Sequence, residues 1–172
     1  MAKAKPNKVD QTEVARAINA LRRMVRGLRA AAESVERDLR ISAAQLFVMS
    51  ELAQSPDQSV KDLAQVTMTT HSTVSEVVSG LLAKGLLTRT VDPKDARRSV
   101  LRLTRQGSAL LRRSPRAIQQ DLIEGFGSLR AAERRALAIG LEKWIEASGL
   151  GATRSEMLFE KPPLGARNRR RR

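Results

Sequence analysis

Residues 86–107 read LLTRTVDPKDARRSVLRLTRQG, and this stretch decides the fold. Residues 86–91 and 99–103 have the composition and the period of two short strands, in contrast to the helical pattern that precedes them. The segment that joins them, residues 92–98, holds a proline and five charged side chains. We therefore predict a β-hairpin with a charged tip, followed by a helix that Thr104 caps.

Four helices are predicted before the hairpin. Apolar residues recur in steps of three and four from Val14 to Leu39, which predicts one long amphipathic helix over residues 11–38 with Asp10 as its cap. The capping-box pattern Ser42-Ala-Ala-Gln45 begins a second helix that ends near residue 54. Ser59 caps a short helix over residues 60–66. The fourth helix carries its apolar residues at 74, 77, 78, 81 and 82, and a glycine at 85 closes it.

The pattern beyond the hairpin is helical again and then dissolves. Ser114-Pro115 kinks or restarts the helix that follows Thr104. A last helix has an apolar side formed by Leu137, Leu141, Trp144 and Ile145. From residue 149 onward, glycines, prolines and an arginine cluster at 167–172 predict a largely disordered basic tail.

Composition restricts the function. The chain has 172 residues and a formal net charge of +14, from 32 Lys and Arg against 18 Asp and Glu, which indicates a polyanionic partner. It has no run of 18 apolar residues and no signal peptide, so we expect a cytoplasmic, nucleoid-associated protein with no membrane partner. The absence of cysteine excludes thiolate chemistry, and the single histidine, His71, predicts neither a metal site nor a triad. We expect no cofactor and no enzyme activity.

The order of the elements is that of a winged helix-turn-helix, with the fourth helix as its recognition helix. If the apolar residues of that helix face inward, Ser72, Thr73, Glu76 and Ser79 face outward. The candidate DNA contacts on this helix are Thr70, His71, Ser72, Thr73, Ser75, Glu76 and Ser79. The alternative is that the whole polar face of this helix is exposed to solvent and contacts no DNA.

Two residues of this helix have open alternatives. Glu76 either accepts a hydrogen bond from a base or completes a capping box with Thr73, if the helix begins there. His71 is either a phosphate contact or a half-buried cap residue.

The hairpin supplies the second set of candidate contacts, which are Lys94, Asp95, Arg97 and Arg98. An arginine at the tip of a wing can enter the minor groove, where A/T-rich stretches concentrate negative potential. Asp95 stands two residues before Arg97 and is placed to hold its guanidinium. The alternative is that these charged side chains are only solvated and contact no DNA.

These segments together resemble the multiple-antibiotic-resistance regulator (MarR) family. Residues 95–101, DARRSVL, match its Asp-x-Arg-x-x-x-Leu wing motif, and residues 103–107, LTRQG, match the Leu-Thr-x-x-Gly that follows. The resemblance covers residues 39–111 closely. It implies a homodimer held by the first and last helices, recognition helices in successive major grooves, and release of DNA on binding small anionic or phenolic effectors.

The predicted fold class is therefore mostly α with a small β-hairpin wing, dimerised through its N- and C-terminal helices. We expect a flexible basic N-terminus over residues 1–9, a helical dimerisation region over 10–39 and 105–148, a DNA-binding lobe over 40–104, and the tail over 149–172. The predicted function is that of a sequence-specific regulator of transcription, most simply a ligand-responsive repressor, on double-stranded DNA. One alternative is a non-specific architectural DNA-binding protein. Another is a winged-helix module that binds proteins and not DNA, which the net charge of +14 disfavours.

Overall fold

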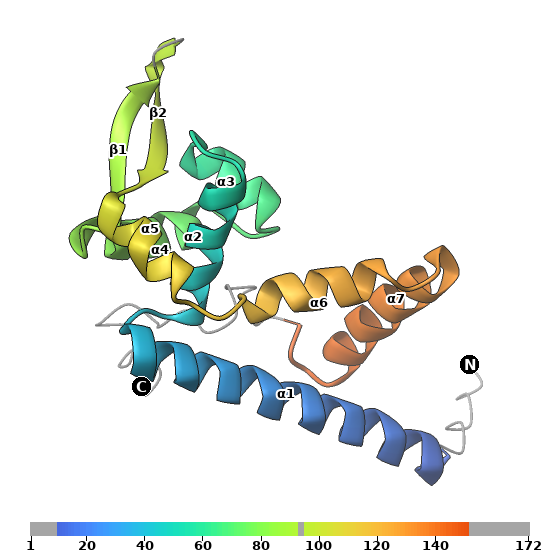
Figure 1. Cartoon of the computed structure of the whole chain (residues 1–172). Helices are drawn as coiled ribbons and strands as arrows, with labels where there is room; N and C mark the ends of the chain where they lie inside the picture. Colours follow the sequence, from blue (N-terminus) through green and yellow to red (C-terminus); the bar gives the residue numbers. More distant parts are fainter. Residues whose placement is uncertain (1–9, 93–94, 152–172) are drawn as a thin grey trace, which may run out of the picture.

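A computed structural model describes residues 10–92 and 95–151 of the chain. Over these residues, four helices precede a two-stranded antiparallel hairpin and three helices follow it (Figure 1). The predicted termini, 1–9 and most of 149–172, lie outside the described residues. The elements are α1 (Gln11–Leu39), α2 (Ala43–Gln54), α3 (Val60–Val66), α4 (His71–Ala83), β1 (Leu87–Asp92), β2 (Asp95–Leu103), α5 (Arg105–Arg112), α6 (Ile118–Gly127) and α7 (Ala131–Ala147).

The ends of the first three helices are set by local hydrogen bonds, as the sequence predicts. A side-chain oxygen of Asp10 accepts from the N–H of Thr12 at 2.8 Å and caps α1. Ser42 and Gln45 form the predicted capping box at the start of α2. A second capping box joins Ser59 and Asp62 at the start of α3. Each satisfies backbone N–H groups that have no partner inside the helix.

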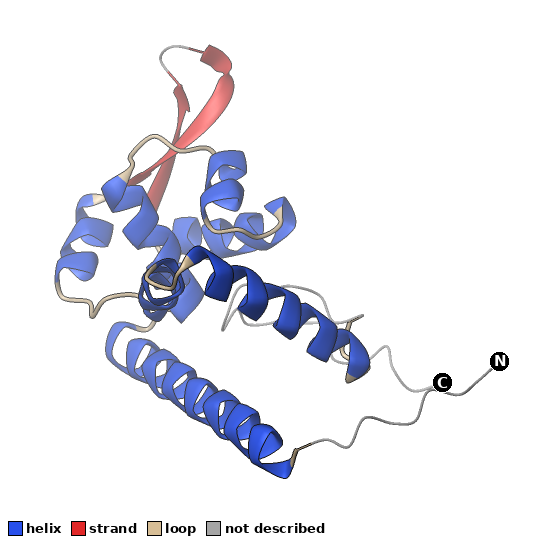
Figure 2. Ribbon diagram, turned by 90° about the vertical axis from the view of Figure 1, so that its right-hand side faces the viewer, coloured by secondary structure: helices blue, strands red, loops and turns tan. Residues whose placement is uncertain are grey.

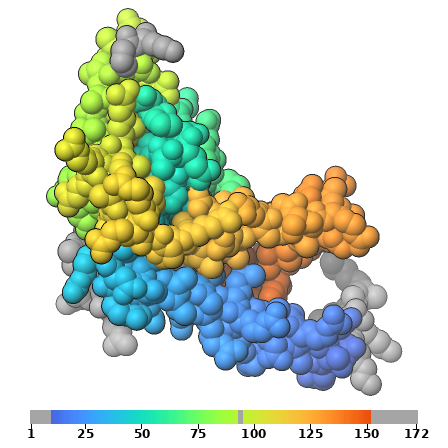
Figure 3. Space-filling model, in the orientation of Figure 1, coloured from blue at the N-terminus to red at the C-terminus, as the bar shows by residue number. Residues whose placement is uncertain are grey.

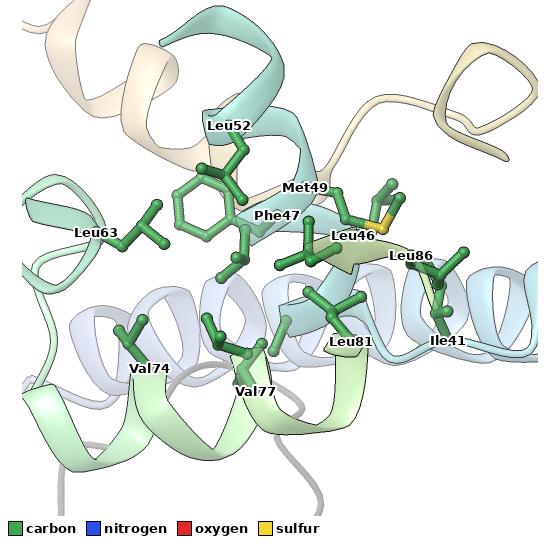
Figure 4. Close-up of a cluster of buried hydrophobic side chains, with 14 of the residues drawn as sticks. Ile41, Leu46, Phe47, Met49, Leu52, Leu63, Val74, Val77, Leu81 and Leu86 are labelled. Carbon is green, nitrogen blue, oxygen red and sulfur yellow. The ribbon is translucent and has the colours of Figure 1, made fainter. Parts of the chain in front are cut away.

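The core lies around α2, in which seven of the 12 residues are buried, and Figure 4 shows the large apolar side chains that meet there. Leu46, Phe47, Met49 and Leu52 of α2 pack against Leu63 of α3 and against Val74, Val77 and Leu81 of α4. Burying large apolar side chains of this kind contributes about 1.5–3 kcal/mol each. The core therefore fixes how α3 and α4, the two helices of the helix-turn-helix, lie relative to each other.

The hairpin projects beyond the helices as a wing (Figure 2). Its base is held by the buried side chains of Leu87, Val100 and Leu101, and the N–H of Leu101 also bonds the carbonyl of Gln58 at 2.9 Å. The second strand is longer than predicted, whereas the first has the predicted length and is shifted by one residue. Residues 95–98, which we assigned to the connection, belong to β2, and a register shift occurs at the end of β1, between Val91 and Asp92. Pairing across the hairpin extends the strand through residues whose polarity alone does not indicate one.

The C-terminal helices divide into two groups. α5 packs against α2 and β2, with Leu110 and Leu111 against the core. The predicted break at Ser114-Pro115 is a restart, and α6 begins at Ile118. α6 and α7 extend with α1 to one side of the lobe (Figure 3), and no residue of α7 is buried.

Candidate nucleic-acid interface

The outer face of α4 is polar and accessible. His71, Ser72, Glu76 and Ser79 are exposed, and Ser75 is half-buried. Thr70 is the N-cap, and its hydroxyl accepts from the N–H of Thr73 at 3.3 Å. Short side chains on an exposed helix next to a wing fit the width of a major groove.

Thr73 is a correction. We expected it to face outward, but it is only 7% exposed, and its hydroxyl accepts from the Thr70 hydroxyl at 2.9 Å. Thr73 lies one residue before Val74 and four before Val77, so it falls on the inner flank of the helix. It is therefore a support for the start of α4 and is not presented to a groove.

The start of α4 also decides the alternatives for Glu76 and His71. The helix begins at His71 with Thr70 as its cap, so the capping box between Thr73 and Glu76 is wrong. His71 is the first residue of the helix and is exposed, so a half-buried capping role is wrong as well. Both side chains are left accessible to a ligand.

Glu76 borders a small open pocket of about 170 Å³ between α4, the end of α1 and the start of α2. Lys84, which follows α4, donates to the carbonyl of Arg40 at 2.6 Å and to the side-chain oxygen of Gln45 at 3.0 Å. These bonds join the C-terminal end of the recognition helix to the junction of α1 and α2. No local sequence pattern marks this role of Lys84, because its two partners are 44 and 39 residues away along the chain.

On the wing, Arg97 and Arg98 differ. Arg98 pairs with Asp62 at the start of α3 and with Asp92 at 3.4 Å. The side chain of Arg97 is exposed and forms no ion pair with a described carboxylate. Arg98 therefore ties the wing to the helix-turn-helix, whereas the side chain of Arg97 is left exposed to solvent. Lys94 lies outside the described residues.

Asp95 contacts Arg97 through a different group than we predicted. Asp95 accepts from the backbone N–H of Arg97 at 3.0 Å, and no bond to its guanidinium is present between these two described residues. The expectation of a direct guanidinium pair is wrong. The carboxylate shapes the strand that carries Arg97 and leaves the guanidinium unengaged.

A second ion pair fixes the root of the wing. Arg102 of β2 binds Asp57 through both carboxylate oxygens, one of them at 2.8 Å. The hydrogen bond from Arg102 lowers the pKa of Asp57. The backbone N–H of Ser59 lowers the pKa of Asp62, and the Ser59 hydroxyl and Arg98 lower it further. Both carboxylates are held ionised, so both ties of the wing persist at neutral pH.

Two larger hollows lie where α5 meets the lobe. The first, about 470 Å³, has apolar walls from the end of α1, from α5 and from Leu86 between α4 and β1, and cationic groups of Arg40, Lys84 and Arg113 around it. The second, about 450 Å³, lies between α2, β2 and α5 and includes Arg102 and Arg112. Among the described residues no group of three or more His, Asp or Glu side chains is placed to hold a metal ion. No described helix has the length and apolarity needed to cross a bilayer.

An exposed polar helix beside a two-stranded wing, on a helix-turn-helix core, defines a winged helix-turn-helix DNA-binding protein. The sequence model of the MarR family matches residues 41–98. The transcriptional repressor NicR of Pseudomonas putida is 29% identical over 110 residues, which cover 64% of this chain and 70% of that protein. The chain is therefore similar to transcription regulators of the MarR family, and residues 41–98 carry that similarity in sequence.

Solved structures agree with this assignment. BpsR of Bordetella bronchiseptica, whose DNA binding is regulated by 6-hydroxynicotinic acid, is 28% identical and superposes with a TM-score of 0.53. The superposition covers 82% of this chain and 97% of that one. Apo MarR of E. coli shares the fold at a TM-score of 0.50 and 22% identity, over 81% of this chain and 99% of that one.

Proposed function

We propose that this regulator is a homodimeric repressor that reads a pseudo-palindromic operator and releases it when a small anionic ring compound binds. The observation that carries the proposal is the accessible polar face of α4 next to a wing whose Arg97 is unengaged. Ser72, Glu76 and Ser79 enter the major groove, where Glu76 accepts from a cytosine amino group. His71 and the Thr70–Ser72 hydroxyl pair, 3.0 Å apart, lie at the helix start and contact phosphates.

The wing gives the second part of the specificity. Arg97 enters the minor groove beside each half-site, while Arg98 and Arg102 hold the wing in place through Asp62 and Asp57. Two lobes of a dimer place two recognition helices about one helical turn of DNA apart. The architectural alternative predicts similar affinity for all duplexes, and site selection from genomic fragments separates the two.

Arg97→Ala should weaken binding to the selected operator by about 1–3 kcal/mol and remove any preference for A/T-rich flanks. The reason is that a minor-groove arginine senses groove width. Fluorescence anisotropy on A/T-flanked and G/C-flanked operators measures both effects. Lys143→Ala on α7, an exposed cation away from the wing, is the control. Equal small losses for both variants on both operators would refute the role of the wing.

The effector site of this proposal is the hollow of about 470 Å³ between the ends of α1 and α4, Leu86 and α5. A ring fits against Ile41, Leu86 and Leu110, and a carboxylate faces Arg113. A ligand there touches the ends of both α1 and α4, so it can bias the position of the recognition helix. The similarity to BpsR, which 6-hydroxynicotinic acid regulates, supports an anionic ring as the class of ligand.

Arg113→Gln should raise the concentration of 6-hydroxynicotinic acid or benzoate needed for operator release by about tenfold or more, because a charged hydrogen bond is lost. Arg112→Gln, which alters the other hollow, should leave it unchanged. Anisotropy of a preformed operator complex gives the release curve. The opposite pattern would place the effector between α2, β2 and α5, and no release by either probe at millimolar concentration would contradict this ligand class.

A further inference from the structure

The positive charge of this chain is concentrated outside the lobe that reads DNA. Residues 40–104 hold eight Lys and Arg against six Asp and Glu, a net charge of only +2 out of +14. Two of these eight, Arg98 and Arg102, are neutralised by ion pairs within the lobe. Binding one operator through the lobe therefore leaves most of the cationic excess without a ligand.

α1 carries a compact part of that excess. Residues 14–32 contain five arginines and no acidic residue, and the five are Arg16, Arg22, Arg23, Arg26 and Arg29. All five are exposed. None forms an ion pair with a carboxylate of the described residues, and the one side-chain bond among them joins Arg22 to the neutral Asn19 at 3.3 Å. Arg116 and Arg130, by contrast, are both paired.

Three of the five arginines lie away from the apolar stripe of the same helix. At 100° per residue, Arg16, Arg23 and Arg26 fall on the side opposite Val14, Val25 and Ala32, whereas Arg22 and Arg29 lie at the border of the stripe, next to Ile18. A dimer that covers the apolar stripe leaves this arginine face of α1 open to solvent. The face therefore remains available in the assembled regulator.

The arginine face is also remote from the wing. α1 lies on the opposite side of the molecule from the hairpin (Figure 1), and its packing within the described chain is chiefly against α2. A straight duplex that occupies α4 and the wing does not reach around to the arginines on the opposite side of the molecule (Figure 1). A polyanion bound to α1 is therefore a second molecule or a distant segment of the same DNA.

We propose that the arginine face of α1 binds the phosphate backbone of a second duplex while the winged lobe holds the first, so that one dimer joins two DNA segments. Guanidinium groups suit phosphates because they donate two parallel hydrogen bonds. A helix that lies on a membrane inserts an apolar face that is opposite its cationic face. In α1 that apolar stripe is covered by the proposed dimer, and the residues that share the arginine face, Ala15, Asn19, Gly27 and Ala30, are small or polar. This function goes beyond repression at a single operator.

The test is a capture assay with the full chain. Operator duplex is immobilised, loaded with protein, washed and offered a labelled duplex of random sequence at low salt. Wild type should retain the labelled duplex. Arg23→Gln/Arg26→Gln should reduce retention about tenfold and lower the salt slope of the second binding step by about 2 per α1, with operator affinity unchanged. Arg135→Gln/Lys143→Gln on α7, which removes the same charge, should behave as wild type.

Each result of the capture assay supports or contradicts the binding of a second duplex to the arginine face. If wild type holds operator but retains no second duplex, the inference is wrong although the repressor function stands. If the protein holds no duplex at all, the repressor function itself fails. Equal loss in the two double variants would show that general charge, and not the arginine face, holds the second duplex. Arginine-dependent flotation with phosphatidylserine vesicles that exceeds duplex capture would assign the face to a membrane.

Discussion

Asp62 shows how much one side chain does at the junction of helix and wing. It accepts from the N–H and the hydroxyl of Ser59, both at 2.8 Å, and so caps α3. The same carboxylate oxygen pairs with Arg98 of β2. The start of the helix-turn-helix and the position of the wing therefore depend on one charge.

Asp62→Asn should lower the free energy of unfolding by about 1 kcal/mol at neutral pH, because the charge that strengthens the cap and the pair is lost. The pKa of Asp62 is lowered from 3.8 in the folded state, so its charge stabilises the fold above pH 3.8. This contribution disappears as the pH falls below 3.8 and through the lower folded pKa. The difference between wild type and variant should shrink in the same range.

Urea unfolding at pH 7, 4 and 2.5 measures this difference. Glu33→Gln, a change at an exposed carboxylate of α1 outside the ion pairs described above, is the matched control and should stay within about 0.5 kcal/mol of wild type at pH 7. A gap for Asp62→Asn that persists undiminished at pH 2.5 would contradict the charge as its origin.

At the scale of elements, α5 lies very close to the root of the hairpin. The hydroxyl of Thr104 donates to the carbonyl of Gly85 at 2.8 Å, and the N–H of Thr104 bonds the carbonyl of Leu86 at 3.1 Å. A Cβ on Gly107 would lie 2.1 Å from that Leu86 carbonyl oxygen. Only glycine permits α5 to lie this close to the strand.

Gly107→Ala should therefore destabilise the fold by about 1–3 kcal/mol, because α5 must move off the hairpin root. Gly27→Ala should change the stability in the opposite direction. A Cβ there meets no atom within 4 Å, and the change should stabilise α1 by about 0.5–1 kcal/mol. Thermal unfolding followed by circular dichroism measures both, and a neutral Gly107→Ala would contradict the close packing.

At the scale of the whole molecule, the single chain leaves a large apolar surface open. Of 29 residues in α1 only Leu28 and Val35 are buried, and none is buried among the 17 of α7. Leu137, Leu141, Trp144 and Ile145 of α7 are each 38–47% exposed. Apolar surface of this extent marks an interface, which supports the proposed dimer.

Leu141→Lys should shift the protein toward a monomer of 19.0 kDa, because a charge is placed inside the proposed interface. Ile139→Lys is the matched control, since Ile139 is equally apolar and 44% exposed but lies on the opposite side of α7. Sedimentation velocity at micromolar concentration gives the masses. A wild-type monomer, or equal dissociation by both variants, would contradict an interface on this side of α7.

The sequence by itself determined the elements whose signals are local. Capping at Asp10, Ser42 and Ser59 involves partners two or three residues away, and apolar spacing marks each helix, so these elements begin where predicted. The winged helix-turn-helix order followed from the same signals.

Tertiary structure alone decided which polar side chains are accessible and which are engaged. Arg98 and Asp62 are 36 residues apart, Arg102 and Asp57 are 45 apart, and Lys84 and Arg40 are 44 apart. No local pattern encodes such pairs, because they form only when the core has placed α3, α4 and the hairpin side by side. The extra length of β2 has the same origin, since strand pairing with residues of β1 overrides local polarity.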